Sequence, residues 1–398
     1  MEANLSYTFV DQPSQFAEAA ERLAEGLGPF CIDTERAGGY RYDDRAFLVQ
    51  IYRKDAGTFL IAPEHHREEF QQHFAPVCNN QEWVIHAASE DLPCLAQLGL
   101  RPYTIFDTEL AARFAGFPAS NLGVLVKDIC QVSLPKQHSK ADWSQTPLSS
   151  SMLEYAAQDV IYLPHLEQAL VHLLDSQGKL EYATQEFAHL VKMRSDPSLM
   201  EHSWLDTPYL SDDLSDLDLT LTKWLWDARD CFAYDHDIAP GLVLPTKLLV
   251  PMAKRRPTTV DELLEFNRSF ESLTEFPYFW LETINDALVS PLESSLREQV
   301  RQPSPKSIWE WTKHNRTALR TQRNIITRVE EICEHLGIRK DLLLTNKVLN
   351  RTLWTAFQER LDWPMEYTRP LLARMGMREW QIDFLAPIFV AEQPCRRR

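Results

Sequence analysis

The sequence predicts an α/β domain followed by two small all-α modules. In residues 1–192, short apolar segments bounded by turn residues alternate with segments of helical periodicity. After about residue 219 no convincing strand appears, and apolar residues recur at helical spacing. Two polar, proline-bearing stretches interrupt the chain. Alternating strands and helices are typical of an α/β domain, whereas runs of helices are typical of separate helical modules.

The N-terminal domain is expected to contain four strands and four long helical segments. The strands are short, apolar and bounded by turn residues, and we place them at 30–35, 46–52, 57–62 and 82–87. Helical spacing occurs at 15–27, 64–74, 90–100 and 149–174. The order and register of the strands do not follow from these patterns.

Composition divides the chain into three domains and two linkers. We place the α/β domain at 1–195, a linker at 196–218, a helical domain at 219–296, a second linker at 297–307 and a second helical domain at 308–398. The first linker is acidic and both contain prolines.

Two local patterns mark the helical modules. Thr259 and Glu262 have the spacing of a capping box, which predicts a helix start. Residues 237–249 resemble residues 337–349 at an offset of 100. Two related helical domains explain this faint repeat, and so do two unrelated bundles.

The composition excludes several classes of protein. The chain has 398 residues and no run of about 18 apolar residues, so we expect no membrane span. Its first residues lack both the basic start and the apolar core of a secretory signal. Seven scattered cysteines without a C-x-x-C pair favour free thiols in a reducing cytoplasm over a disulfide framework or a zinc site. The sequence does not determine the oligomeric state, and we expect a monomer.

The charge is distributed unevenly. The net charge of −16 argues at first sight against a nucleic-acid partner. However, residues 301–398 hold 18 basic and 11 acidic side chains, whereas residues 201–300 hold 8 and 19. A basic C-terminal quarter on an acidic body suggests a polyanionic partner. A solvated basic tail is the alternative, but most of these charges lie in helical sequence.

The stretch "GPFCIDTERAGG" places two carboxylates on one expected strand. Asp33 and Glu35 are two residues apart, so their side chains point to the same face. Burial of an unpaired carboxylate is costly. Two such groups together therefore need a solvent-exposed position or a cation.

Further acidic residues occur in two other segments. Asp91 lies at the start of an expected helix that Ser89 could cap. Tyr155 and Asp159 are four residues apart on one helical face. Taken singly, each carboxylate could be a solvated strand end or a helix-dipole partner. Taken together, their order is Asp-x-Glu, Asp and Tyr-x3-Asp within one α/β domain.

These motifs resemble the ribonuclease D family, which belongs to the DEDD superfamily of 3′-to-5′ exonucleases. "IDTE", "HAASEDL" and "YAAQD" match the three motifs, and the resemblance extends over roughly residues 5–190. The last motif has the tyrosine of one subtype, because the sister subtype has histidine at the position of Glu154. The helical regions resemble the HRDC domains of that family, the second less closely than the first.

The resemblance implies a fold, an activity and a metal site. The fold would be a ribonuclease H-like mixed sheet flanked by helices, followed by two HRDC-like domains. The activity would be metal-dependent 3′-to-5′ hydrolysis of RNA to nucleoside 5′-monophosphates, with tRNA 3′ maturation as its role. Asp33, Glu35, Asp91 and Asp159 would bind two divalent cations, Mg²⁺ or Mn²⁺. Tyr155 would orient the attacking water.

Two stretches near these motifs have residues suited to single-stranded RNA with a free 3′ end. Basic groups follow phosphates and aromatic rings stack on bases. The candidates are Arg36, Tyr40, Arg41 and Tyr42 after the first motif, and Lys136, His138, Lys140 and Trp143 before the third. Ordinary exposed loops are the alternative. The chain departs from the family at Arg36, where an apolar residue is common, so the local pocket should differ. We expect the basic C-terminal module to supply the main electrostatic attraction for RNA.

Two other functions fit parts of the sequence. A DNA 3′-to-5′ exonuclease of the same superfamily would use the same chemistry, and no residue pattern reveals the 2′-hydroxyl contact that would separate the two. A catalytically idle RNA-binding scaffold is the second alternative. The intact motifs argue against the scaffold.

Overall fold

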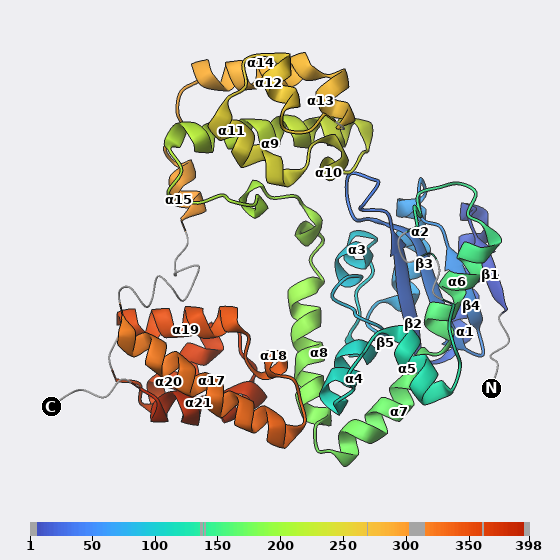
Figure 1. Ribbon diagram of the computed structural model, residues 1–398. Coiled ribbons are helices and arrows are strands. Elements are labelled where there is room, and N and C mark those ends of the chain that lie inside the picture. The colour runs from blue at the N-terminus through green and yellow to red at the C-terminus, as the bar shows by residue number, and fades with distance from the viewer. Residues whose placement is uncertain are drawn as a thin grey trace.

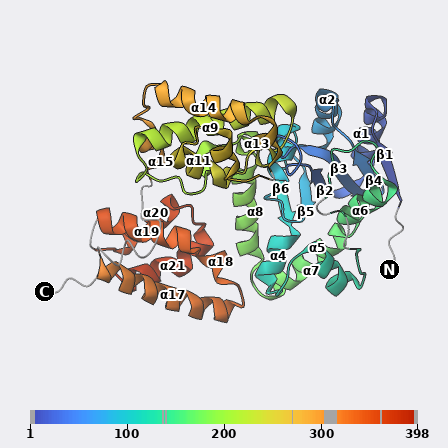
Figure 2. The ribbon, with the colours of Figure 1, turned by 45° about the horizontal axis from the view of Figure 1, so that its top comes forward.

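The computed structural model describes residues 6–135, His138 and residues 141–268, 270–301, 315–359 and 362–393. An α/β domain and two helical modules are visible in Figure 1. Helix α8 (Leu180–Arg194) lies between the sheet and the C-terminal module in Figure 1 and in Figure 2. No helix in the described part of the chain is long and apolar enough to cross a bilayer.

The predicted mixed sheet forms the centre of the α/β domain, and it has six strands. The strands are β1 (Tyr7–Val10), β2 (Leu27–Arg36), β3 (Ala46–Lys54), β4 (Gly57–Ile61), β5 (Glu82–Ile85) and β6 (Thr104–Asp107). Their spatial order is β1-β4-β3-β2-β5-β6. The pairs formed by β2, β3 and β4 are antiparallel, and the remaining pairs are parallel.

All four predicted strands are confirmed, but β1 and β6 were missed. Each has only four residues, so neither offers enough positions for a period-two pattern to emerge. The predicted helix at 149–174 is two helices, α6 (Ser150–Ile161) and α7 (Leu163–Ser176). Pro164 lies in the first turn of α7, where its missing N–H is tolerated, and this explains the break.

Helices cover both faces of the sheet. The other helical elements of the domain are η1 (Pro13–Gln15), α1 (Phe16–Glu25), α2 (Arg67–Cys78), α3 (Leu92–Gln97), α4 (Thr108–Ala115), α5 (Leu122–Leu125) and η2 (Val126–Cys130). On one face, Leu48 and Leu60 pack in a cluster with Ala156 and Ala157 of α6. Because Glu35 pairs with Leu48 across the strands, the acidic end of β2 faces α6.

The first helical module includes residues from both segments that were expected to be linkers. Its elements are η4 (Trp204–Asp206), α9 (Asp216–His236), α10 (Pro240–Val243), η5 (Thr246–Leu248), α11 (Leu249–Arg255), α12 (Val260–Leu264), α13 (Glu271–Glu275), α14 (Pro277–Val289) and α15 (Leu296–Val300). The short η3 (Pro197–Met200) precedes them and packs against α3 of the α/β domain. Trp204 and Leu214 are buried in its core, as are Leu296 and Val300. These few apolar side chains attach the otherwise polar linker segments to the core of the module.

The predicted capping box at the start of α12 is only half present. The Thr259 hydroxyl accepts a hydrogen bond from the Glu262 N–H at 3.3 Å. The Glu262 carboxylate accepts from the N–H of Thr258 at 2.8 Å instead of from that of Thr259.

The second helical module repeats the start of the first. Its helices are α17 (Arg316–Leu336), α18 (Lys340–Leu343), α19 (Asn346–Glu359), α20 (Met365–Arg374) and α21 (Glu379–Ala391). Helices α9 and α17 begin and end 100 residues apart, and so do α10 and α18. Asp237 and Gly337, which end the two long helices, both have left-handed backbone conformation. The matching ends of these two helix pairs and the shared left-handed residue favour two related modules over two unrelated bundles.

The second module packs directly on the α/β domain. The Glu186 carboxylate on α8 accepts from Arg378 Nε at 2.6 Å and from Trp380 Nε1 at 2.7 Å. Trp380 is buried and stacks on Tyr182, with ring centroids 5.2 Å apart. Buried residues of the module belong to the same apolar cluster as the core of the α/β domain. Deleting the module would therefore expose part of that core.

We expect Glu186→Ala to weaken this docking strongly. The substitution leaves the Arg378 guanidinium and the buried Trp380 N–H without their acceptor, which should cost about 2–3 kcal/mol. Urea unfolding of the full chain measures the loss. Thr184→Ala on the same helix is the control and should change stability by less than about 0.5 kcal/mol, because Thr184 is exposed and its hydroxyl donates only to the backbone of its own helix. Equal losses in the two variants would contradict this account.

Candidate active site

Three carboxylates from two elements meet beside the sheet. Asp33 and Glu35 project from one face of β2, and Asp159 comes from α6, which covers that face. One carboxylate oxygen from each lies within 4.8 Å of the others. Carboxylate oxygens are the ligands that hard divalent cations prefer. The strand and helix therefore form a group of donors suited to a metal ion, as the sequence predicted.

Asp91 lies next to this group and is held by two partners. Its Oδ1 accepts a hydrogen bond from the Thr34 hydroxyl at 2.5 Å and lies 3.9 Å from Arg36 Nε. It occupies the N-cap position of α3, but its side chain makes no cap bond. Ser89 lies two residues before that position, so its predicted capping role is wrong. The Asp91 charge is near enough to raise the pKa of Glu35 and of Asp159.

Asp107 sets the turn that presents Asp91, and sequence reasoning missed it. Its buried carboxylate accepts from the N–H groups of Ala87 at 3.1 Å and of Ala88 at 2.9 Å. The same carboxylate caps α4 by accepting from the N–H groups of Glu109 and Leu110. Ala87 has a φ of 60°, a conformation that needs such support. The pattern "FDTEL" resembles a helix N-cap, and this pattern could have predicted the capping role of Asp107.

Burial and like charge make the four motif carboxylates hard to ionise. Burial, followed by repulsion from neighbouring carboxylates, raises the pKa of Asp33, of Glu35 and of Asp91 well above the ordinary range. The same causes raise the pKa of Asp159 to about 7. Bound dications would offset this repulsion, because they supply the opposite charge. The donor set therefore fits divalent metal ions, whose use is characteristic of such acidic clusters.

Tyr155 lies one helical turn before Asp159, close to the cluster. Burial and then the charges of Asp159, Glu35 and Asp33 raise the pKa of its phenol, so Tyr155 is neutral at physiological pH. A neutral phenol can hydrogen-bond to a water near the carboxylates. The rings of His138 and Trp143 lie 6.1 Å and 6.2 Å from the Tyr155 ring.

The predicted RNA contacts before the third motif lie only partly in described sequence. Trp143 is 3% exposed and packs in the cluster beneath α6, so it has no free face on which a base could stack. His138 is half-buried, and its Nε2 has no hydrogen-bond partner among the described residues. Lys136 and Lys140 lie outside the described residues.

The loop after the first motif binds the first helical module instead of presenting all its side chains to solvent. The Tyr42 hydroxyl donates to Asp230 at 2.9 Å. Arg41 Nε donates to Ser144 at 2.7 Å. The RNA contacts predicted for Arg41 and Tyr42 therefore compete with intramolecular bonds. Tyr40 remains 44% exposed.

Arg45 and Asp237 are the centre of this contact, which we call the clasp. Two Arg45 nitrogens donate to the two Asp237 carboxylate oxygens at 3.0 Å and 2.8 Å. Asp237 also accepts from the Tyr42 N–H at 3.3 Å. The two partners are 192 residues apart, and no local pattern in the sequence indicates the pair.

Arg36 lies between the clasp and the carboxylates. It forms an ion pair with Asp44, and its Nη1 lies 3.6 Å from Glu90. Arg36 and Asp44 line a pocket of about 530 Å³ next to Glu35 and Tyr40. They also line a second pocket of about 590 Å³ between the α/β domain and the first module.

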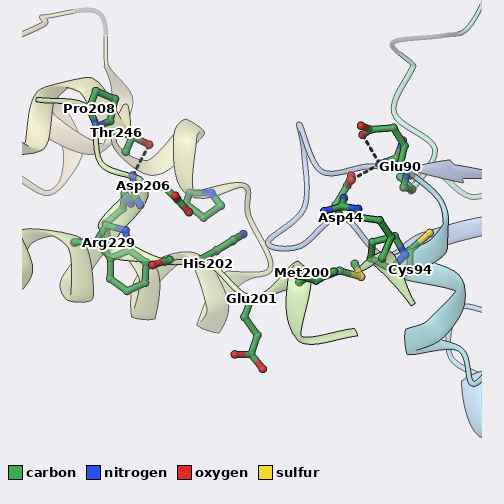
Figure 3. Close-up of a pocket in the computed structure, with 17 residues that line it drawn as sticks. Asp44, Glu90, Cys94, Met200, Glu201, His202, Asp206, Pro208, Arg229 and Thr246 are labelled. Carbon is green, nitrogen blue, oxygen red and sulfur yellow. Dashed lines mark hydrogen bonds and ion pairs between the residues drawn. The ribbon is translucent and has the colours of Figure 1, made fainter. Parts of the chain in front are cut away.

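Figure 3 shows the second pocket with Glu90, Asp44 and Cys94 on one side and Arg229 and Asp206 on the other. Its basic lining groups are Arg36, Arg194, His202 and Arg229. Arg229 is buried, and its guanidinium donates to Thr246 Oγ1 at 2.8 Å. The pocket thus extends from Arg36 and Asp44 toward the first helical module.

Three protein families match successive parts of the chain. A family described as "3'-5' exonuclease" matches residues 7–175. The HRDC domain family matches residues 218–269. A family described as "3' to 5' exonuclease C-terminal domain" matches residues 304–392. The matches agree with the resemblance read from the motifs, which is thereby confirmed.

Similar proteins extend this agreement over most of the chain. "Ribonuclease D" of Shewanella sp. (strain ANA-3) is 30% identical over 277 residues, which cover 67% of this chain and 69% of that protein. A crystal structure of a protein from Bifidobacterium adolescentis matches with a TM-score of 0.81 and 27% identity, over 97% of this chain and 96% of that one. Escherichia coli RNase D, described as an exoribonuclease involved in structured RNA processing, has the same fold, with a TM-score of 0.69 and 22% identity over 93% and 98% of the two chains.

The raised carboxyl pKa values predict how stability depends on pH. These groups hold protons more tightly in the folded chain, so their contribution is complete below about pH 4, the pKa range of an unfolded chain. It is lost as the pH rises through the folded pKa, which for Asp159 is about 7. We expect the metal-free protein to lose thermal stability between pH 5 and pH 8.

Scanning fluorimetry across that pH range tests the expectation. Addition of Mg²⁺ or Mn²⁺ should restore stability most at the higher pH, because cations bind the deprotonated carboxylates. Asp159→Asn removes one titrating group and should flatten the dependence. A metal-free protein that becomes more stable from pH 5 to pH 8 would contradict the assigned direction.

Proposed function

Because this chain belongs to the ribonuclease D family of 3′-to-5′ exoribonucleases, we propose that it trims the free 3′ ends of tRNA precursors. It would act as a monomer in the cytoplasm and release nucleoside 5′-monophosphates. The observation that carries the proposal is the convergence of Asp33, Glu35 and Asp159 within 4.8 Å, beside Tyr155. Such a group suits phosphodiester hydrolysis, which needs a polarised water and neutralised phosphate charge.

The four motif carboxylates would hold two divalent cations, either Mg²⁺ or Mn²⁺. When bound, the cations would supply positive charge against the phosphate and favour ionisation of water. Asp33, Glu35 and Asp159 would be direct ligands, and Asp91 would complete the set from its position beside Thr34. The Tyr155 hydroxyl would accept a hydrogen bond from the attacking water and hold it in line with the leaving 3′ oxygen.

The two pockets that meet at Arg36 would hold the RNA strand. The terminal nucleotide would enter the pocket beside Glu35, where Arg36 and the exposed Tyr40 face it. Arg36 lies nearest the carboxylates among the basic candidates and would contact the scissile phosphate. Preceding nucleotides would lie in the second pocket, near Arg194 and His202. The bonds of Arg41 and Tyr42 to other residues make them weaker candidates.

The second helical module would supply long-range attraction for RNA. Arg316, Arg320 and Arg323 are exposed on α17 at spacings of four and three, so they share one helical face. None of the three forms an ion pair within the described part of the chain. Most other described arginines of the module pair with carboxylates, as Arg374 does with Glu359.

Matched RNA and DNA oligonucleotides test the proposed activity. We expect processive or distributive shortening of RNA with a free 3′ hydroxyl in the presence of Mg²⁺ or Mn²⁺, and no shortening of RNA with a 3′ phosphate. Product analysis should identify nucleoside 5′-monophosphates. Equal degradation of RNA and DNA would favour the DNA exonuclease, and attack on blocked ends would remove the 3′-to-5′ assignment.

Asp33→Asn is the variant that ties this activity to the site. The amide keeps the size of the side chain but removes the negative charge, so cleavage should fall at least about 100-fold while RNA binding is retained. Asp55→Asn is a surface control on the same sheet and should leave turnover unchanged, since Asp55 lies in an exposed turn. Wild-type turnover in Asp33→Asn would exclude Asp33 from the site.

The basic face of α17 is tested by the salt dependence of RNA binding. For single strands the slope of log affinity against log salt concentration is about −0.7 per phosphate neutralised. Replacing Arg316, Arg320 and Arg323 with Gln should therefore make the slope shallower by up to about 2. The matched control replaces Arg339, Arg369 and Arg374, which already have acidic partners. The two triple variants lose the same charge, so an equal effect would mean that net charge alone attracts RNA.

A further inference from the structure

Gln50 on β3 is an unpaired polar side chain in the core of the α/β domain. Its exposure is 0%, and neither Nε2 nor Oε1 has a hydrogen-bond partner among the described residues. Buried amides are almost always hydrogen-bonded, because loss of water without a new partner costs free energy. A buried, unpaired glutamine therefore requires an explanation beyond folding.

The register of the sheet places Gln50 directly opposite Asp33. The two residues are Cα partners in the antiparallel pair of β2 and β3. Opposed residues in such a pair point to the same face, with Cβ atoms about 4.5–5.5 Å apart. The amide thus lies beside a carboxylate of the candidate metal site and on the same face of the sheet.

Two neighbours of Gln50 on this face are leucines. Leu60 is its partner on β4, and Leu48 lies two residues before it on β3. Both leucines belong to the cluster that α6 covers. A leucine or methionine at position 50 would match these surroundings and fill a similar volume. The amide is therefore not needed for packing. Asp33 is the acidic residue directly opposite it, and Glu35, which pairs with Leu48, is its diagonal neighbour on β2.

We propose that Gln50 is a positioning residue for the metal site, whose amide Nε2 donates a hydrogen bond to the Asp33 carboxylate in the metal-loaded protein. A carboxylate has about four acceptor positions on its two oxygens, and a metal ion uses only part of them. In a buried site the remaining positions need donors, and such donors fix the orientation of the ligand. Gln50 is a side-chain donor on the same face as Asp33, on the adjacent strand.

This proposal rests on the proposed role of Asp33 as a metal ligand and makes an unusual prediction. The unpaired amide should lower the stability of the metal-free protein and raise its affinity for metal. Removing the amide should therefore raise the stability and lower the affinity. Gln50→Met removes the amide and nearly preserves the volume. Gln50→Leu is a second variant with a branched side chain, in case the longer one packs poorly.

Two measurements on the full chain test the role without relying on turnover. The unfolding midpoint of the metal-free Gln50→Met protein should rise by about 2–4 °C. Calorimetric titration with Mn²⁺ should show affinity about 10–100-fold weaker than that of the wild type. Leu48→Met is the matched control on the same strand and face. It should leave the Mn²⁺ affinity unchanged within about twofold, which is much less than the effect expected when a ligand loses an orienting hydrogen bond.

Each outcome bears on a separate part of the argument. Unchanged Mn²⁺ affinity in both Gln50 variants, with normal binding by the wild type, would overturn the positioning role alone. A lower midpoint in both metal-free variants would show that the amide already stabilises the metal-free fold, and would also overturn it. A wild-type protein that binds no Mn²⁺ or Mg²⁺ would instead overturn the proposed metal site.

Discussion

The structure is organised around an unfavourable interaction, the mutual repulsion of carboxylates held close together out of water. Asp33, Glu35 and Asp159 bring oxygens within 4.8 Å, and burial adds to the cost of ionising them. The chain must therefore stabilise each acidic side chain from its surroundings. The sheet register holds the first two, α6 holds the third, and Thr34 with Arg36 holds Asp91. A bound cation would supply the positive charge that these carboxylates lack in the metal-free state, and would thereby stabilise the fold.

The carboxylates are linked to the first helical module through a short series of contacts. Arg36 touches both Asp91 and Asp44. Asp44 lies in the loop that Arg45 attaches to Asp237 at the end of α9. The loop between β2 and β3 thus joins the acidic end of β2 to another domain. Arg36, which follows the first motif, is held here by two acidic neighbours, Asp44 and Glu90.

Sequence alone could predict which carboxylates come together better than it could predict their surroundings. The four central strands and the motif carboxylates follow from apolar runs and short motifs, which are local properties of the chain. The strands β1 and β6 are too short for a periodic pattern. The clasp joins residues about 190 positions apart, and the support from Asp107 depends on a turn nearly 20 residues away. Trp143 was predicted to stack on RNA bases, but it is buried, and composition alone does not indicate burial.

The clasp also explains why the first helical module is acidic although the protein belongs to a family that acts on RNA. Residues 201–300 carry 19 acidic and 8 basic side chains, which would repel a phosphate backbone. Two of those acids, Asp230 and Asp237, bind Tyr42 and Arg45 of the α/β domain. These two acidic residues of the module therefore hold the domain that carries the carboxylates. In the proposed function, RNA is attracted by arginines elsewhere, namely Arg36 beside the carboxylates and the arginines on the exposed face of α17.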